Sequence, residues 1–263
     1  MSTADVVVIG AGVMGASAAW HLASLGVRSV IVIDASAAPG AGSTGLATGG
    51  FRAQFASAVN VRLSLRSRDK LRSFAEETRG DCGYQPVGYL FLAASEAELG
   101  VLREAQRVQH AAGLGEATLL APDEIARVQP NIRLDDVIGA AWCPSDGYIS
   151  PMGLLRGYLD AACERGVRVR WGAPLERVEC SAGRVAAVRA GGDRIATGAV
   201  VNAAGPQAAE VAAMAGASLP VTPVRRQVAV TSPTAALPST SPMTIWAGDG
   251  FHFRVRDGRV LLL

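Results

Sequence analysis

The amino-acid sequence predicts an α/β fold that has α+β character overall. A short apolar strand, a glycine-rich turn, a helix and a second apolar strand follow one another within residues 4–34, which is the pattern of a βαβ unit. Residues 151–205 again alternate: an amphipathic helix is expected from Pro151 to Gly166, followed by a strand, a hairpin that turns at "SAGR" and a buried strand at residues 199–205. Residues 81–145 differ, because short strands there accompany a charged helix, and residues 217–263 contain strand-like runs that begin with residues 221–231, as in a mixed sheet.

Composition and charge restrict the classes of protein that need to be considered. With 263 residues, 49% hydrophobic and 18% charged, the chain has a globular composition. The net charge is +2 and the basic residues are scattered, which argues against binding to nucleic acid or an anionic membrane surface. No stretch approaches the ~20 apolar residues of a membrane span.

The cysteines, histidines and N-terminus give three further expectations. The four cysteines are widely spaced and only three histidines are present, so we expect no metal site and reduced thiols. The N-terminus has no basic segment before its apolar run. We therefore expect no signal peptide and a cytoplasmic location.

The first motif is a glycine-rich turn between a strand and a helix. Residues 4–9 ("ADVVVI") have the β-branched character of a buried parallel strand. Gly10, Gly12 and Gly15 follow at GxGxxG spacing, and a helical pattern then runs to Gly26. Gly10 permits a tight turn, Gly12 lets the backbone approach a pyrophosphate, and Gly15 lets the helix pack closely on the strand. The turn predicts a Rossmann-like βαβ unit.

The second strand of this unit, "SVIVID", ends at Asp34. A carboxylate about twenty residues after the glycines accepts hydrogen bonds from a ribose hydroxyl, and it disfavours the 2′-phosphate of NADP. The helix N-terminus offers N–H groups and a positive dipole end to phosphates. These features predict a site for NAD or FAD, with a purely structural βαβ unit as the alternative.

A second glycine-rich loop, "PGAGSTGLATGGFRAQF", covers residues 39–55. Its small residues suit close approach of the backbone to a ligand, and Ser43 and Thr44 offer hydroxyl groups to phosphate or ribityl oxygens. FAD is longer than the adenylate half of NAD and needs such a second tract, so the loop favours FAD. The alternative is a flexible surface linker.

Four stretches in order resemble the FAD-dependent amino-acid oxidoreductases of the D-amino-acid oxidase-like superfamily, in particular its sarcosine oxidase, glycine oxidase and dimethylglycine dehydrogenase branch. They are "VVVIGAGVMGASAAWHLASLG", "GSTGLATGGFRAQF", "SDGYISPMGLLRGYLDAACERGVRV" and "VVNAAGPQAAEVAAMAG". The resemblance implies a Rossmann-like FAD-binding domain interleaved with a mixed-sheet substrate domain. It assigns residues 1–80 and 146–216 to the FAD-binding domain, and residues 81–145 and 217–263 to the substrate domain.

The same resemblance adds cofactor contacts beyond the first turn. It implies that the backbone near Val178 meets the adenine side of FAD, and that Ala204 and Gly205 approach the pyrophosphate. Core packing is the alternative for Val178.

The resemblance also implies a chemistry and three residues that take part in it. Relatives bind a small amine or amino acid and pass a hydride to the flavin. Arg52 would lie near the isoalloxazine ring, while His252 and Arg254 would line the substrate pocket, with Arg254 as an anchor for a carboxylate. The alternatives are a surface arginine for Arg52 and a packing residue for His252.

The last residues, "DGRVLLL", read as a strand that ends on three leucines, and the family continues beyond this point. We therefore expect either a fragment or a shortened protein. An FAD-dependent oxidoreductase of small amines or amino acids is the leading hypothesis, and a non-catalytic module that binds a nucleotide or a partner is the second. An NAD-dependent dehydrogenase is disfavoured by the second glycine-rich loop. Oligomeric state and redox partner are left open by the sequence.

Overall fold

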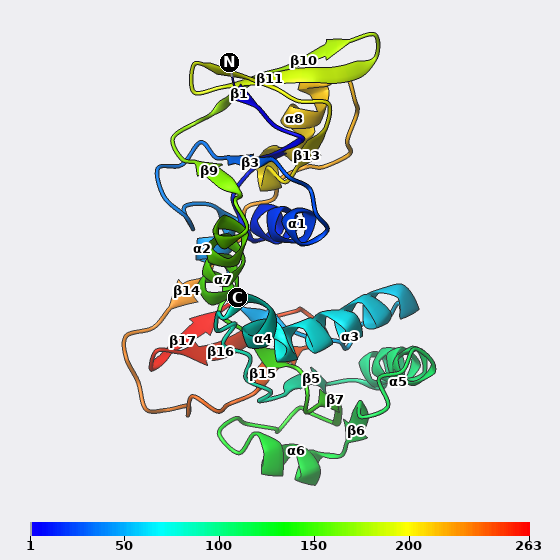
Figure 1. Cartoon of the computed structure of the whole chain (residues 1–263). Coiled ribbons are helices and arrows are strands. Elements are labelled where there is room, and N and C mark those ends of the chain that lie inside the picture. Colours follow the sequence, from blue (N-terminus) through cyan, green and yellow to red (C-terminus); the bar gives the residue numbers. More distant parts are fainter. Residues whose placement is uncertain (1) are drawn as a thin grey trace. The chain divides into compact units, whose positions relative to one another are not determined.

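A computed structural model describes residues 2–263 and divides them into two compact units (Figure 1). The first unit contains the chain up to Ala47, Phe74–Cys82 and Ser150–Arg225, and the second contains Thr48–Ser73, Gly83–Ile149 and Arg226–Leu263. The chain thus passes repeatedly from one unit to the other.

The largest difference from the expected domain boundaries concerns residues 48–73, which the sequence assigned to the first domain and which belong to the second unit. Most of this segment is α3 (Ala58–Arg72), which lies beside α5 (Glu96–Ala111). Its residue Val61 is fully buried in a cluster with Leu114. Burial of this apolar face keeps the segment with the second unit. Residues 81–82 and 217–225, in turn, belong to the first unit, and residues 146–149 belong to the second.

A four-stranded parallel sheet forms the centre of the first unit. Its strands in spatial order are β13 (Val200–Asn202), β2 (Val6–Ile9), β3 (Val30–Ile33) and β9 (Arg168–Arg170). Helix α1 (Val13–Ser24) connects β2 to β3, and β13 pairs with the opposite edge of β2. The strand order therefore reverses beside β2, which is where ligands bind in open parallel sheets.

Helix α7 (Pro151–Glu164) packs against α1 and begins as the sequence predicts. The hydroxyl of Ser150 accepts the N–H of Gly153 at 3.0 Å, and Pro151 occupies the first turn, where no N–H is needed. The helix is followed by Gly166, which has a positive φ of 86°. These signals are local, so they could be interpreted without knowledge of the rest of the fold.

The first unit has a second, mixed sheet, and several short elements complete it. The strands of this sheet in spatial order are β1 (Ser2–Thr3), β12 (Asp193–Ala196), β11 (Arg184–Ala190) and β10 (Leu175–Ser181). The short elements are α2 (Ser43–Leu46), α4 (Phe74–Thr78), η1 (Gly205–Gln207) and α8 (Ala208–Met214). The predicted β10–β11 hairpin turns at Ala182 and Gly183, both with positive φ. A shared core includes Ile31, Val188 and Ile195, all fully buried.

The second unit is built on a seven-stranded mixed sheet. Its strands in spatial order are β14 (Ala229–Val230), β17 (Arg259–Leu262), β16 (His252–Arg256), β15 (Met243–Trp246), β5 (Tyr89–Ala93), β7 (Gly139–Cys143) and β6 (Thr118–Leu120). Only the β15–β5 pair is parallel among the described pairs of this sheet. Helix α6 (Pro122–Val128) contacts β7, and a separate ribbon pairs β4 (Gly50–Phe51) with β8 (Gly147–Tyr148).

Two expectations about local structure are corrected. Residues 221–231 read as a strand, but only Ala229–Val230 forms one, because Pro220 and Pro223 lack N–H donors for a ladder and the preceding residues are exposed. The loop expected over residues 39–55 contains the short elements α2 and β4.

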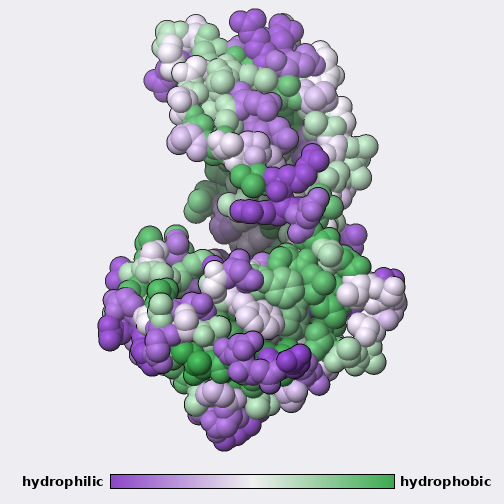
Figure 2. Space-filling view, turned by 180° about the vertical axis from the view of Figure 1, so that it is seen from behind, coloured by the Kyte–Doolittle hydropathy of each residue, from purple (hydrophilic) through white to green (hydrophobic). Residues whose placement is uncertain are grey.

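The surface mixes polar and apolar residues. Figure 2 shows hydrophilic and hydrophobic residues interspersed over the visible face of the first unit, and a broader hydrophobic area on the second. Exposed large apolar side chains of the second unit include Val59, Leu63, Val101, Val228 and Val230. No helix within residues 2–263 is long and apolar enough to cross a membrane.

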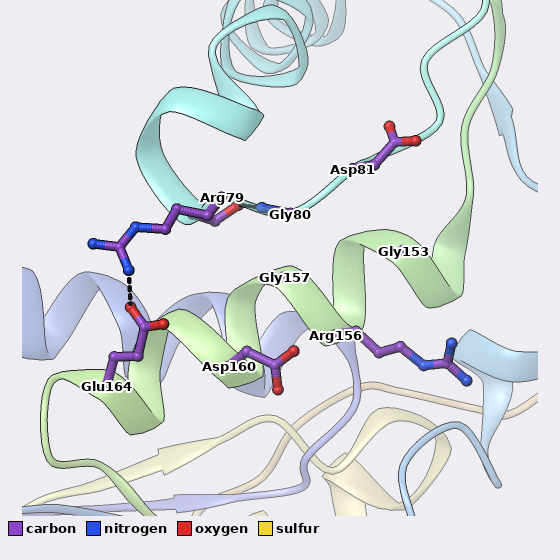
Figure 3. Close-up of a pocket in the computed structure, with 9 residues that line it drawn as sticks. Arg79, Gly80, Asp81, Gly153, Arg156, Gly157, Asp160 and Glu164 are labelled. Carbon is purple, nitrogen blue, oxygen red and sulfur yellow. Dashed lines mark hydrogen bonds and ion pairs between the residues drawn. The ribbon is translucent and has the colours of Figure 1, made fainter.

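A hollow of about 370 Å³ lies in the first unit between residues 78–81 and α7 (Figure 3). Arg79 pairs with Glu164 at 3.5 Å across it. A Cβ on Gly157 would lie 2.6 Å from the Phe74 ring. Glycine at this position of α7 therefore allows the helix to approach the neighbouring segment closely.

Candidate functional site

A cleft of about 570 Å³ opens where the parallel sheet of the first unit reverses its strand order. It is formed by the turns that follow β2, β3, β9 and β13, together with α2 and α8. The predicted cofactor residues that line it are Gly10, Gly12, Asp34, Ser43, Thr44, Ala204 and Gly205. The structure thus gathers residues from distant parts of the sequence at one carboxyl edge of the sheet.

The three glycines of the first turn have different surroundings. Gly10 has a φ of 101°, and a Cβ there would lie 2.4 Å from the Ala203 carbonyl oxygen. A Cβ on Gly15 would lie 1.8 Å from the Gly10 carbonyl oxygen, so this glycine allows α1 to pack behind the turn. Gly12 is the N-cap of α1, and a Cβ there would lie 3.3 Å from Thr44 Oγ1, at the surface of the cleft.

Asp34 lies at the carboxyl end of β3 and its two oxygens accept backbone hydrogen bonds. Oδ2 accepts the N–H of Ala11 at 2.7 Å, and Oδ1 accepts the N–H of Ser36 at 2.7 Å. A carboxylate has about four acceptor positions, so capacity remains for ribose hydroxyls. The two backbone hydrogen bonds fix the orientation of the carboxylate, and with it the direction of the lone pairs that remain for a ligand in the cleft.

Ser43 and Thr44 begin α2, beside the start of α1. Thr44 Oγ1 accepts the N–H of Val13 at 3.1 Å, so the second glycine-rich loop is held against the first turn. Glycine backbone, helix N–H groups, hydroxyls and one carboxylate are the groups that a dinucleotide requires. The residues present therefore fit the phosphate and ribose portions of FAD.

Of the remaining predicted cofactor residues, Ala204 and Gly205 line the cleft near Gly10, and Val178 does not line it. Gly205 follows β13 with a φ of 55°, and Ala204 donates its N–H to Asn202 Oδ1 at 3.3 Å. Val178 is 4% exposed and packs in the shared core of the first unit, and it is not among the residues that line the cleft. Its side chain therefore has the core role named as the alternative, and a contact of its backbone with adenine stays a prediction.

Several residues that line the cleft were not predicted. Trp171 directly follows β9, and Glu210 and Met214 lie on α8. The position of Trp171 at the carboxyl end of a parallel strand could have indicated it, because side chains at such ends converge. The two residues of α8 give no comparable signal in the sequence.

We expect Asp34→Asn to weaken FAD binding roughly 10- to 100-fold. The side-chain NH2 of asparagine would replace an oxygen that accepts a backbone N–H, and hydrogen bonds to charged groups contribute about 1.5–3 kcal/mol. A fluorescence titration with FAD measures the dissociation constant. Asp5→Asn is the matched control, because Asp5 accepts the N–H of Ser29 at 3.0 Å at an exposed site outside the cleft. Equal affinities for the two variants would contradict the role of Asp34.

The second unit contains the predicted catalytic residue Arg254 in a buried position. Arg254 on β16 is 5% exposed, its guanidinium carbon lies 3.7 Å from the centre of the Tyr148 ring, and it donates a hydrogen bond to the Thr48 carbonyl. No carboxylate of the described residues forms an ion pair with it. Burial lowers the pKa of Arg254. Arg254 is therefore a buried cation whose carboxylate partner is not supplied by the described chain.

Arg52, the second predicted catalytic residue of this unit, contacts two aromatic rings. Its guanidinium carbon is 4.6 Å from the centre of the Phe55 ring and 5.2 Å from that of Phe91. Burial raises the pKa of Tyr89, and the positive charges of Arg52 and Arg254 both oppose that rise. The charges of both arginines therefore act on the Tyr89 phenol.

His252 lies two residues before Arg254 on β16, so the two share a face of the sheet. Its side chain is half-buried, and its Nδ1 is 2.8 Å from the carbonyl oxygen of Gly250. This contact fixes the orientation of the ring. A role in substrate binding stays a prediction.

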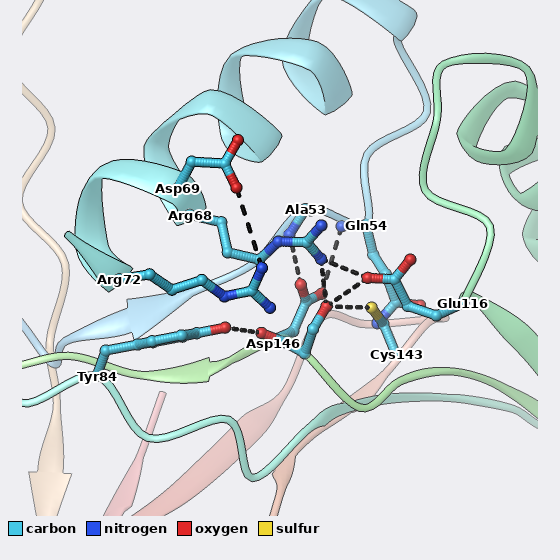
Figure 4. A network of polar contacts seen from close by, with 10 residues as sticks. Ala53, Gln54, Arg68, Asp69, Arg72, Tyr84, Glu116, Cys143 and Asp146 are labelled. Carbon is cyan, nitrogen blue, oxygen red and sulfur yellow. Dashed lines mark hydrogen bonds and ion pairs between the residues drawn. The ribbon is translucent and has the colours of Figure 1, made fainter.

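A buried carboxylate that sequence reasoning missed lies next to Arg52. Asp146 is 0% exposed and accepts the backbone N–H groups of Ala53 at 2.7 Å and Gln54 at 3.3 Å (Figure 4). Burial raises the pKa of Asp146 to about 6, and the two backbone hydrogen bonds oppose the rise. The sequence gives no signal for it, because its partners are more than ninety residues away.

The raised pKa of Asp146 predicts a pH dependence of stability. Since the folded pKa is above the ordinary value of 3.8, the folded state holds this proton more tightly, and stability present below pH ~4 is lost as the pH rises through ~6. We expect the free energy of unfolding of the wild type to fall by about 3 kcal/mol relative to Asp146→Asn between pH 4 and 7. Urea denaturation across this range measures both curves, and parallel curves would contradict the prediction.

The fold and the cleft define a dinucleotide-binding α/β protein with a second, mixed-sheet unit. Comparison with known families identifies it further: the family described as FAD dependent oxidoreductase (DAO) matches residues 5–262, and the chain belongs to this family. FAD is the cofactor of the family. The resemblance inferred from the four sequence stretches is thus confirmed.

Individual relatives agree with the family. Mitochondrial sarcosine dehydrogenase of Mus musculus is 32% identical over 236 residues, covering 88% of this chain and 26% of that protein. The crystal structure of glycine oxidase from Geobacillus kaustophilus superposes with a TM-score of 0.85 at 26% identity, covering 100% of this chain and 71% of the other. The mitochondrial pyruvate dehydrogenase phosphatase regulatory subunit of Mus musculus is 26% identical over 208 residues, covering 79% of this chain and 24% of that protein. The chain spans about a quarter of the length of the curated relatives it matches.

Proposed function

We propose that this protein binds FAD in the cleft of the first unit and oxidises the C–N bond of a small amine or amino acid, of the sarcosine, glycine or D-amino-acid type. The observation that carries the proposal is the cleft itself, which combines the glycine turn, Asp34 and Thr44 at the point where the strand order reverses. The names of sarcosine dehydrogenase and glycine oxidase among its relatives support the class of substrate.

The chain's own residues have separate tasks in this proposal. Gly10 and Gly12 leave room for phosphate, and Asp34 orients the ribose. When bound, FAD supplies the acceptor for a hydride. Arg254 offers its two-pronged guanidinium to the carboxylate of an amino-acid substrate, since that carboxylate would neutralise a cation that has no acidic partner among the described residues.

The visible spectrum of the purified chain, with and without added FAD, tests the proposal. Flavin absorbance near ~450 nm should elute with the protein and bleach when sarcosine, glycine or a D-amino acid is added without oxygen. A chain that retains FAD but is not reduced by any of these compounds would overturn the proposed oxidation. A chain that does not retain FAD would overturn the proposed use of the cleft.

A second candidate is a non-catalytic module that binds FAD and a protein partner. It is favoured by the similarity to a protein named as a regulatory subunit. Retention of FAD without reduction by amines, as in the first of the two negative results above, is the result expected of such a module.

A further inference from the structure

The buried carboxylate of Asp146 holds a short piece of backbone next to Arg52. It accepts two successive N–H groups, those of Ala53 and Gln54. The residues before Arg52 are held by the same loop. Gly50 and Phe51 of β4 pair with Tyr148 and Gly147 of β8, which directly follow Asp146. The segment that contains Arg52 is therefore fixed by the loop that contains Asp146 on both sides of the arginine.

The loop that carries Asp146 is itself held from several elements (Figure 4). Ser145 Oγ accepts a hydrogen bond from Arg68 of α3 at 2.7 Å and donates one to Glu116 at 2.8 Å. The Tyr84 hydroxyl donates to the Ser145 carbonyl oxygen at 2.5 Å. A loop with so many partners presents the carboxylate in one position.

Once the backbone is fixed, contacts with neighbouring residues restrict the position of the Arg52 guanidinium. The aromatic rings of Phe55 and Phe91 both lie beneath it. Gln54 is 4% exposed and its Nε2 donates to the Tyr89 carbonyl oxygen at 3.1 Å, which ties the backbone after Arg52 to β5. A shift of this backbone would move the arginine away from the two rings.

We propose that Asp146 is a positioning residue, whose carboxylate fixes the backbone at Ala53 and Gln54 and thereby sets the position of the Arg52 guanidinium. The importance of that position for oxidation rests on the function proposed above. The fixing of the backbone does not, so the two parts are tested separately.

Protonation should loosen this arrangement, because a neutral carboxyl has lost one acceptor oxygen to its own proton. The titratable groups that interact with Asp146 are Cys143 of β7, Tyr89 of β5 and Tyr84 of the segment before β5. Arg68 and Glu116 form hydrogen bonds with Ser145 of the same loop. Burial raises the pKa values of Cys143 and both tyrosines. Asp146 is therefore the group of this set that changes charge near pH 6.

The first test needs no activity. In the full chain, the amide resonances of Ala53 and Gln54 and the Nε–H resonance of Arg52 are followed by NMR from pH 4.5 to 8. All three should shift together with a midpoint near pH 6 in the wild type, and the shared transition should disappear in Asp146→Asn. A transition that persists in the variant, or that is absent from Arg52, would overturn the proposal.

The second test measures the reduction of bound FAD by sarcosine in Asp146→Asn, Arg52→Met and the double variant. Asp146→Asn should retain FAD and slow reduction about 10- to 100-fold, as expected for a displaced group. The double variant should be no slower than Arg52→Met, because a residue that acts through another adds nothing once that other is gone. Losses that multiply would overturn the proposal. A wild type that is not reduced at all would defeat the proposed function, while the NMR titration would still decide whether Asp146 fixes Arg52.

Discussion

Gly15→Ala is expected to abolish retention of FAD. The new methyl group would lie 1.8 Å from the carbonyl oxygen of Gly10, and that atom belongs to the backbone of the turn, so no side-chain rotation relieves the contact. Overpacking in protein cores typically costs about 1–3 kcal/mol, and a clash between a helix and the turn it follows should exceed this range. We expect a loss of affinity of more than about 100-fold, measured as flavin absorbance that elutes with the protein.

Gly198→Ala is the matched control for this prediction. Gly198 belongs to the first unit but does not line the cleft, a Cβ there would have no heavy atom within 4 Å, and its φ lies outside the left-handed region. This variant should retain FAD and unfold at the same temperature as the wild type. If both alanine variants retain FAD equally, close packing of α1 on the turn is not what shapes the cleft.

Arg254→Met should lower the efficiency of sarcosine oxidation by roughly 30- to 5,000-fold, which corresponds to the ~2–5 kcal/mol lost when a buried charge pair loses one partner. Methionine preserves much of the buried length but removes the guanidinium. The loss should appear mainly in KM, because the arginine holds a carboxylate that does not react. Stopped-flow reduction of FAD at varied sarcosine concentration gives both constants.

Two controls separate this effect from general damage to β16. Arg256→Met changes an exposed arginine on the same strand and should leave oxidation unchanged. Dimethylamine, which has no carboxylate, should be oxidised slowly by the wild type and at a similar rate by Arg254→Met. A loss of the same size with dimethylamine would show that Arg254 does not act on the carboxylate.

The parts of the fold that sequence reasoning predicted well are those whose signals are local. The strand, glycine turn and helix at residues 4–24 and the capped helix at Pro151 were predicted because their residues interact with near neighbours. The position of Asp34 in the cleft could also be predicted, since its distance from the glycines is set by the length of one helix and one strand.

The parts that were missed depend on contacts between distant segments. Asp146 meets Ala53 and Gln54 only after the chain has folded. Residues 48–73 were assigned to the first domain because they follow the glycine loops, yet the apolar face of α3 is buried against the second unit's own residues. The spacing of apolar residues in the sequence shows that a helix has an apolar face, but it does not show which part of the protein packs against that face.

The alternation of the chain between the two units has a consequence for synthesis. Strand β2 leaves the ribosome well before its neighbour β13 at residues 200–202, so the parallel sheet cannot be completed until both segments have emerged. Pairings between such distant segments fold slowly, and the apolar strands remain open to aggregation in the meantime. Slower translation and chaperones that bind nascent chains should therefore raise the soluble yield, and because each unit is built from three separated segments, neither can be obtained by cutting the chain at a single point.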